Sequence, residues 1–282
     1  MPQHYCFCTL AVGKRYRLHA AMLAEDIQKY ASGKAFVVLT DKPQDFEKFS
    51  NVLAFSHRLQ SVKGYHDKRF VLEKALSLFE ACIFVDSDIR LLGPIPKTLP
   101  FADGLVARYG CGIIKHNLAD KARAAFTSIQ SVAKTLDLDL EDVFWFHEFM
   151  FLLSKQQGKE QVFLDYWRAI AHEFEMKGIY DGEGSVMGLA AAASGLDVNF
   201  HRSDFFPCFK DSIQREKIKN GEADPQTMTD EFEAHREIEY PSRSLLQKVI
   251  QKVQAKTGFY RRLFTLKLSA LLPTDTKLKV SR

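Results

Sequence analysis

The chain has 282 residues, enough to bury a large core, and 46% hydrophobic with 26% charged residues is typical of a globular protein. A net charge of +4 favours anionic ligands or surfaces but is too small to indicate nucleic-acid binding. No basic and apolar leader opens the sequence and no run of about 18 apolar residues occurs, so we expect a cytoplasmic protein without a membrane span. The five cysteines lack zinc-type spacing and are expected to be reduced thiols.

The first forty residues predict a strand, a helix and a second strand. The apolar run Tyr5–Ala11 suits a buried strand, and Gly13 interrupts it. In residues 15–31 apolar side chains recur at alternating steps of four and three, which is the spacing of one helix face. Residues 36–41 form another short apolar run, which ends at Asp41. A connection of this length between buried strands predicts parallel pairing.

A second crossover leads to the stretch where we expect the site. Residues 52–59 are a candidate strand, and residues 68–79 carry the apolar stripes of a helix. The uninterrupted apolar run Ala81–Val85 suits a central strand that is covered on both faces. Ligands of such sheets bind outside the carboxyl ends of the strands, where residues 9–11, 41 and 86–88 should gather.

Asp86 and Asp88 follow the central strand two residues apart. In extended backbone this spacing points both carboxylates the same way, and together they could hold one hard divalent cation that carries a diphosphate. An Asp-Ser-Asp sequence is alternatively a solvated turn, since Asp and Ser bond their own backbone there. The apolar strand before the pair, and the strand ends that converge on it, favour a metal site.

The remaining chain predicts further elements of the same α/β type. Strands are expected at residues 105–109, 112–115 and 198–200, and helices at residues 118–135, 161–174 and 186–194. From residue 241 the composition changes to a basic helix with one apolar side. We therefore predict a domain of residues 1–240 and a basic amphipathic helical tail of residues 241–282.

In this order the motifs resemble the GT-A glycosyltransferases, in particular retaining families related to glycogenin, the lipopolysaccharide galactosyltransferases and the blood-group transferases. The matching segments are residues 9–16, 36–41, the helix that carries Lys74, 84–88 and 180–183, and they cover most of residues 5–205. The resemblance implies an α/β fold with a Rossmann-like, mixed but mostly parallel sheet flanked by helices, and a helical C-terminal appendage.

The resemblance also implies a donor site. Thr9, Ala11 and Tyr16 would line a nucleoside pocket, with Tyr16 stacked on a uracil-like base, although Tyr16 equally fits the buried stripe of its helix. Asp86 would bond the ribose or share the metal. Asp88 would ligate a Mn²⁺ or Mg²⁺ ion that bridges the two phosphates and neutralises the leaving group. The other candidates for donor binding are Asp41, Lys74, Ser87 and Lys210.

Acidic residues before a helix are the catalytic candidates. Asp181 and Glu183 resemble the residues that these families place opposite the sugar and the acceptor, where a carboxylate could stabilise an oxocarbenium-like centre or accept a proton. Helix capping is the alternative, because acidic side chains suit a helix N-terminus. His201 is the candidate third metal ligand, although the chain lacks the His-x-x-Gly-x-x-Lys-Pro-Trp pattern of these families in that region.

Two further stretches are candidates for partner binding. His147 and Glu148 interrupt an apolar run, which fits either an acceptor site or a satisfied core pair. The tail interleaves basic and apolar side chains, so it could lie on the inner face of an anionic membrane, or it could dock on the domain.

The sequence thus predicts a metal-dependent glycosyltransferase of the hexosyltransferase type. It would move a sugar from a nucleotide donor, a UDP-sugar, to a hydroxyl acceptor on a glycan, lipid or protein, with retention of configuration. One alternative is a phosphohydrolase of the haloacid dehalogenase type, but that family has Thr or Val where this chain has Arg90, and here a whole βαβ unit precedes the motif. The other is a noncatalytic module that binds nucleotide sugars or a membrane surface.

Overall fold

A seven-stranded sheet forms the centre of the computed structural model, which describes residues 4–119, 123–242 and 244–269. The strands lie in the order β3-β2-β1-β4-β9-β6-β10. β9 is antiparallel to both of its neighbours, and all the other neighbouring pairs are parallel. The predicted α/β architecture, a Rossmann-like mixed and mostly parallel sheet flanked by helices, is confirmed. The strands are β1 (Tyr5–Ala11), β2 (Phe36–Thr40), β3 (Val52–Ser56), β4 (Ala81–Val85), β6 (Gly104–Ala107), β9 (Met150–Ser154) and β10 (Val198–Phe200).

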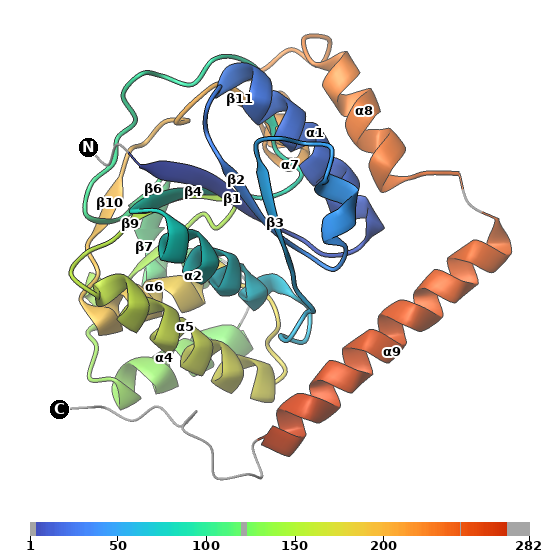
Figure 1. The fold of residues 1–282 in the computed structure, drawn as a ribbon. Coiled ribbons are helices and arrows are strands. Elements are labelled where there is room, and N and C mark those ends of the chain that lie inside the picture. Colours follow the sequence, from blue (N-terminus) through green and yellow to red (C-terminus); the bar gives the residue numbers. More distant parts are fainter. Residues whose placement is uncertain (1–3, 120–122, 243, 270–282) are drawn as a thin grey trace.

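Helices cover both faces of this sheet (Figure 1). α1 (Lys14–Tyr30) lies on one face, and α2 (Lys68–Leu78), α4 (Arg123–Thr135), α5 (Lys159–Met176) and α6 (Glu183–Ser194) lie on the other. Side chains alternate along a strand, so Cys6 and Cys8 join the core under α2 and α5, whereas Phe7 joins the core under α1. The sheet therefore separates two buried hydrophobic clusters, and the uninterrupted apolar runs in β1 and β4 follow from burial on both faces.

The first half of the chain forms the two parallel crossovers that the sequence predicts. The 3₁₀ helices η1 (Pro43–Phe46) and η2 (Tyr65–Asp67) precede β3 and α2. Because β1, β2 and β4 are parallel, the residues that follow them lie at one edge of the sheet. The stretch Asp86–Asp88 leaves that edge directly after β4.

After β4 the structure corrects one prediction. The strand expected at residues 112–115 is wrong, because β7 (Gly110–Gly112) ends there and α3 (Ile113–Ala119) begins. The side-chain amide of Asn117 donates to the Ile113 carbonyl at 2.8 Å across this turn of helix. The two β-branched residues at 113 and 114 therefore lie in a helix despite their preference for strands. The helix predicted at residues 118–135 is divided between α3 and α4, and residues 120–122 lie outside the described residues. The 3₁₀ helix η3 (Leu140–Asp142) and β8 (Phe144–Phe146), which pairs with β7, follow α4.

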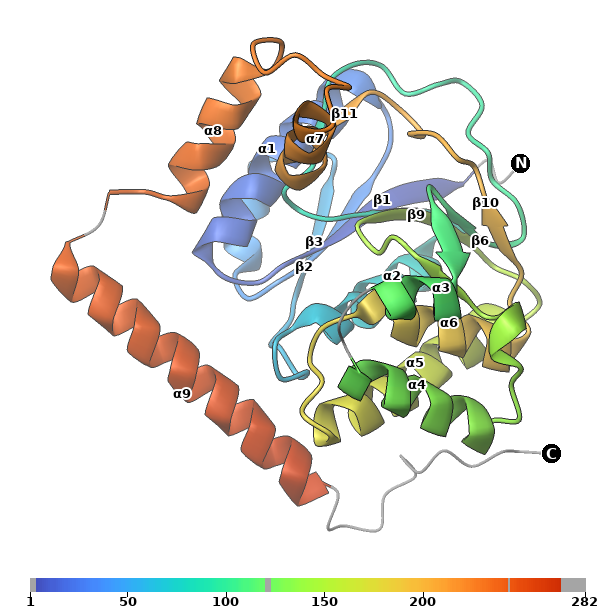
Figure 2. The ribbon, with the colours of Figure 1, turned by 180° about the vertical axis from the view of Figure 1, so that it is seen from behind.

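Short elements after β10 return the chain to the acidic stretch. β5 (Arg90–Leu91) and β11 (Cys208–Phe209) form a two-stranded antiparallel sheet in which Phe209 is opposite Arg90. α7 (Asp211–Lys219) and α8 (Thr229–Glu239) follow, and α8 lies against α1 (Figure 2). No prediction from the sequence covered β5, β11, α7 or α8.

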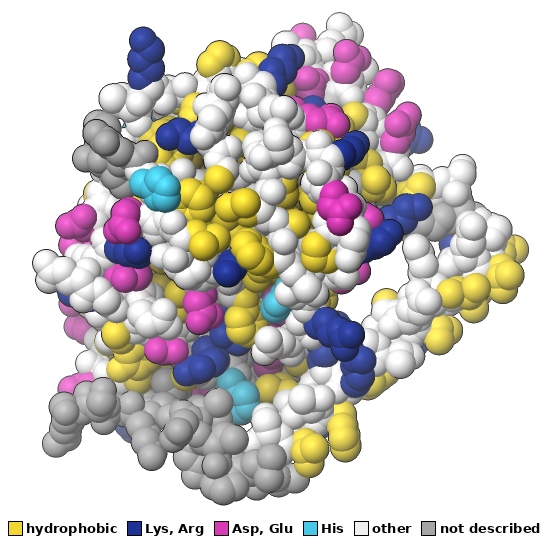
Figure 3. All heavy atoms as spheres, in the orientation of Figure 1, with side chains coloured by type: hydrophobic (Ala, Val, Ile, Leu, Met, Phe, Trp, Pro, Cys, Tyr) yellow, Lys and Arg dark blue, Asp and Glu magenta, His cyan; other side chains and the backbone are white. Residues whose placement is uncertain are grey.

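The tail forms α9 (Leu245–Ser269), and residues 270–282 lie outside the described residues. Near its C-terminal end α9 contacts the domain, where Arg262 donates to the Val62 carbonyl at 2.9 Å and Phe259 packs against Tyr180. Its first half is not docked: Leu245 is 81% exposed and Val249 is 59% exposed, and hydrophobic side chains lie along the outer edge of the helix (Figure 3). Among the described residues, no helix is both long and apolar enough to span a bilayer.

Candidate active site

A cavity of about 1050 Å³ opens at the carboxyl ends of β1 and β4. Its wall is built by the residues that follow β4, by η2 and the start of α2, by the start of α6, and by one side each of α7 and α8. Parallel α/β sheets bind ligands at this edge. The cavity is large enough to hold a nucleotide together with a sugar.

The acidic pair lines this cavity and binds an ammonium group. Nζ of Lys210 lies 3.2 Å from a carboxylate oxygen of Asp86 and 2.6 Å from one of Asp88. The pairing of β11 with β5 carries Lys210 to this position, since the register places Phe209 opposite Arg90. Burial would raise the pKa of Asp88, but the charge and hydrogen bond of Lys210 lower it below its usual range, so Asp88 is ionised.

The pair also fits the expected metal ion. Two carboxylate oxygens that reach one ammonium nitrogen can reach one divalent ion, and oxygen is the donor type that Mg²⁺ and Mn²⁺ prefer. Lys210 stands in for the positive charge, and its flexible side chain would move aside for a metal. The structure does not bring His201 to the pair: it follows β10, which β6 and β9 separate from β4, and its ring stacks on Phe205.

Lys68 joins the acidic pair to Glu183, one of the two predicted catalytic carboxylates. Its Nζ lies 3.0 Å from a carboxylate oxygen of Asp86 and 3.0 Å from one of Glu183, and it donates to the Glu148 carbonyl at 3.3 Å. The side chain is buried at the start of α2, where the helix dipole disfavours a cation. Burial would lower the pKa of Lys68, but Asp86 and Glu183 raise it well above its usual value. Lys68 is therefore a permanent cation in the cavity wall.

Glu183 begins α6 and points to Lys68, whereas Asp181 lies at the exposed rim of the cavity. Burial would raise the pKa of Glu183, but the charge of Lys68 lowers it, so Glu183 is a buried carboxylate anion. Asp181 forms an exposed ion pair with Lys63 at 3.0 Å. Glu183 thus lies at a helix N-terminus, as the capping alternative requires. In addition it has a charged partner, Lys68, in the cavity wall.

Glu148 is a second buried carboxyl group in this wall. Its Oε2 is buried and has no hydrogen-bond partner among the described residues, and burial together with the charge of Glu183 raises its pKa from the usual 4.5 to about 7. Glu148 precedes β9, which runs against its neighbours, so the start of this strand lies at the edge where β4 ends. His147 points elsewhere, into a group of aromatic rings with Tyr109 and Phe149, so the two residues do not form a core pair.

Replacing Glu148 by glutamine should change how stability depends on pH. A carboxyl whose pKa is raised by folding holds its proton more tightly in the native state, so it favours folding at low pH and this contribution is lost as pH rises from about 4.5 through 7. Between pH 5 and pH 8 the free energy of unfolding of Glu148→Gln should therefore rise by on the order of 2–3 kcal/mol relative to that of the wild type. Urea unfolding at the two pH values measures this gain, and an unchanged difference between the proteins would contradict it.

The structure brings Tyr16 and Ser87 to the cavity and places five other predicted donor-binding residues outside its lining. Tyr16 is 40% exposed, so it does not belong to the buried stripe of α1, and the Arg15 guanidinium covers one face of its ring at 4.5 Å. Only the other face is open to a base. Ser87 is buried between the two aspartates. Besides Lys210, which bonds the acidic pair, the residues outside the lining are Thr9, Ala11, Asp41 and Lys74.

These four residues have structural contacts. Thr9 is fully buried and its Oγ1 donates to the Val85 carbonyl at 2.7 Å, which ties β1 to β4. Asp41 accepts from the Gly13 amide at 2.8 Å and pairs with a guanidinium of α1. Lys74 lies over the Phe55 ring at 4.2 Å, and Ala11 is fully buried. Leu10 and Val12, at the alternate positions of the first strand and its turn, line the cavity instead.

Sequence reasoning missed Lys68 and the contribution of α8. A signal for Lys68 exists, because a lysine that opens a helix opposes the helix dipole and needs an acidic partner. For His235 and Glu239, which α8 adds to the cavity wall, we find no sequence signal: they lie on a polar helix whose position depends on tertiary packing.

Comparison with known proteins adds a fold-level likeness. No family model matches the sequence, and no curated protein sequence matches it. Among solved structures, the galactosyltransferase LgtC in complex with donor and acceptor sugar analogues aligns with 69% of this chain and 72% of its own, at 8% sequence identity and a TM-score of 0.47. These values concern the arrangement of elements and say nothing about the chemistry of this chain.

Proposed function

We propose that this protein is a glycosyltransferase that moves a sugar from a UDP-sugar to a hydroxyl group of a glycan, lipid or protein. The observation that supports this most is the continuous ionic network in the cavity: Lys210 joins Asp86 and Asp88, and Lys68 joins Asp86 and Glu183. It puts groups for a diphosphate next to a carboxylate for a sugar. A nucleotide-sugar donor carries its diphosphate directly next to its sugar, so its site needs these two kinds of group side by side.

The donor half of the site would bind the diphosphate. Asp86 and Asp88 would hold a Mn²⁺ or Mg²⁺ ion, which supplies charge neutralisation for the departing nucleoside diphosphate when it is bound. Lys210 is released from the pair in that state and can bond a phosphate oxygen. Lys68 stays at Asp86 as a second, permanent cation. The open face of Tyr16 offers a stacking surface for the uracil ring.

The half that holds the transferred sugar and the acceptor would be formed around Glu183, for which we propose a role in transfer with retention of configuration. Glu183 is an ionised carboxylate at the start of α6, and it can stabilise positive charge that develops at the anomeric carbon. The nearby Glu148, with a pKa of about 7, can hold or release a proton at neutral pH. Asp181, which lines the rim of the cavity, would contact the acceptor.

Replacing Glu183 by glutamine should lower turnover by about 10²- to 10³-fold, because the amide keeps the shape but loses the charge that favours the transition state. Donor affinity should stay within about threefold of the wild type, since the diphosphate groups bind elsewhere. Steady-state kinetics and calorimetry with UDP separate the two. If the variant instead unfolds below the temperature at which the wild type melts and loses its donor, Glu183 serves only to cap α6.

The proposal itself is tested with nucleotide sugars. Thermal melting with a panel of UDP- and other nucleotide-linked sugars, with and without Mn²⁺, should raise the melting temperature for the donor, because a ligand that binds only the native state stabilises it. The same donor should then be hydrolysed slowly or transferred to a sugar acceptor. Binding without any turnover would favour a noncatalytic module, and phosphate release from phosphate monoesters would favour a phosphohydrolase.

We also propose that α9 contacts an anionic membrane surface. Support comes from its exposed apolar side chains and from lysines such as Lys248 and Lys252 on the same helix. A chain that ends at residue 241 should lose binding to vesicles that contain about 30% phosphatidylserine, while the full chain binds them and neither binds neutral vesicles. Equal sedimentation of both chains with anionic vesicles would reject this contact.

A further inference from the structure

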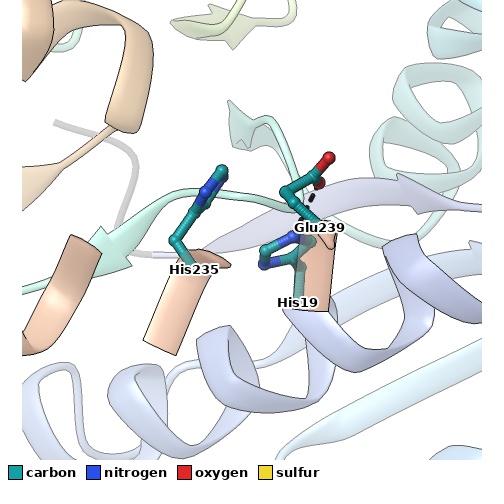
Figure 4. Close-up of side chains that lie close together, drawn as sticks. All are labelled: His19, His235 and Glu239. Carbon is teal, nitrogen blue, oxygen red and sulfur yellow. Dashed lines mark hydrogen bonds and ion pairs between the residues drawn. The ribbon is translucent and has the colours of Figure 1, made fainter. Parts of the chain in front are cut away.

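Two histidines and a glutamate form a cluster where α8 crosses α1 (Figure 4). His19 belongs to α1, whereas His235 and Glu239 lie four residues apart on one face of α8. One nitrogen of each imidazole and one carboxylate oxygen all lie within 4.8 Å of one another. The proposed sugar transfer uses none of these three residues.

The interface that contains this cluster is polar. None of the residues of α8, all of which the structure describes, is buried. Its contacts with α1 include an ion pair of Arg15 with Glu239 at 2.8 Å, a hydrogen bond of His19 with Glu239 at 3.0 Å, and the two imidazole rings with centroids 4.9 Å apart. His19 is 2% exposed, so α1 buries a potential ligand beside α8, whose Phe232 and His235 rings pack on Phe209.

We propose that His19, His235 and Glu239 bind one divalent transition-metal ion, for which Zn²⁺ is the best match. Two imidazoles and one carboxylate are a donor set that Zn²⁺ takes with a fourth position left open. In a tetrahedral site with metal–ligand distances of about 2.0–2.1 Å, neighbouring ligand atoms lie about 3.4 Å apart. Nε2 of His19 and Oε1 of Glu239 are 3.0 Å apart, and one ligand atom of each of the three residues lies within 4.8 Å of the other two.

The surroundings favour a cation at this point. Arg15 binds Oε2 of Glu239, which leaves Oε1 for the ion. Oδ1 of Asp211 lies 3.7 Å from Nδ1 of His235, where a carboxylate can orient a ligating imidazole from the second shell of a metal. The charge of Asp88 acts on both histidines. Burial lowers the pKa of His19, so its ring is in the neutral form that ligates metals.

This site differs from the acidic pair in its donor atoms and in the effect that a bound ion would have on the structure. Nitrogen donors favour Zn²⁺ over Mg²⁺, whereas the oxygens of Asp86 and Asp88 favour harder ions. An ion at the cluster would join α8 to α1. Because His235 and Glu239 also line the cavity, the bound metal would fix the wall that α8 contributes to it.

The test titrates ZnCl₂ into the full chain after removal of metals with a chelator, and it needs no sugar donor. We expect one site with a dissociation constant of about 1 μM or lower, since ligand sets of this kind contribute strongly to binding. His235→Ala and Glu239→Ala should each weaken binding by about 100-fold or more, whereas His201→Ala, at an exposed histidine outside the cluster, should leave it unchanged. Binding that survives both α8 substitutions, or that depends on His201, would overturn the proposal.

A second measurement does not depend on affinity. Zn²⁺ should slow hydrogen exchange of the backbone amides of α8 in the wild type and leave it unchanged in His235→Ala, because the ion closes a contact between two helices. His19 is buried and its replacement could unfold the chain, so the variants on α8 carry the test. Identical exchange of α8 with and without Zn²⁺ in the wild type would show that no metal joins the helices.

Discussion

Replacing Lys68 by methionine is expected to lower the free energy of unfolding by about 3–5 kcal/mol, because it leaves the buried carboxylate of Glu183 without its cation. Asp86 and Glu183 share the Lys68 ammonium at 3.0 Å each, and methionine keeps most of the volume but none of the charge. Donor binding should fall with it, since the permanent cation of the cavity is gone. Urea unfolding measures the first effect, and calorimetry with UDP and Mn²⁺ measures the second.

Lys74→Met is the matched control, because Lys74 lies on the same helix with its ammonium over an aromatic ring and outside the cavity lining. It should change stability by no more than about 1 kcal/mol. Combining Lys68→Met with Glu183→Gln should recover part of the lost stability, since the second change removes one of the uncompensated charges. A Lys68→Met protein as stable as the wild type would mean that the network contributes nothing to folding.

Replacing Asp88 by alanine is expected to abolish the Mn²⁺-dependent part of UDP binding, a loss of about 100-fold or more. Asp88 is ionised and shares a single cation with Asp86, so its removal leaves one carboxylate to hold a divalent ion. Calorimetry with UDP in Mn²⁺ and again in EDTA isolates the metal-dependent part. In EDTA the variant and the wild type should bind UDP equally weakly, within about threefold.

Asp41→Ala is the informative comparison for this experiment. The sequence places Asp41 among the donor-binding residues, but in the structure it bonds the Gly13 amide and Arg17 and lies outside the cavity lining. Its replacement should reduce stability by about 1–2 kcal/mol and leave the affinity for UDP intact. If Asp41→Ala loses UDP while Asp88→Ala keeps it, the donor binds at the end of β2 and the acidic pair is a structural turn.

Local pattern was sufficient to predict the first half of the fold. The runs in β1, β2 and β4 and the helical periodicity between them depend on neighbouring residues alone, and they gave the parallel crossovers and the position of Asp86 and Asp88. Residues 112–115 were assigned wrongly because two adjacent isoleucines favour strands, whereas the backbone turns into α3 after Gly112. Propensity over four residues does not resolve such a boundary.

The site was predicted less completely, because its partners come from distant parts of the chain. Alternation along β1 decides whether Thr9 or Leu10 meets the cavity, and the sequence does not reveal which face that is. Glu148 reaches the site from the beginning of an antiparallel strand, whereas the rule for parallel sheets directs attention to strand ends. Lys210 depends on the short pairing of β11 with β5, which four residues specify.

That pairing has a consequence for the order in which the protein matures on the ribosome. Asp88 is synthesised long before Lys210, so the emerging chain carries an aspartate whose ion-pair partner has not yet been made. The sheet from β1 to β4 can assemble from local segments. Lys210 pairs with Asp88 at the cavity only when the last third of the polypeptide folds back onto the sheet. A truncated product that stops before β11 would therefore contain the sheet but lack the lysine that pairs with the acidic residues of the cavity.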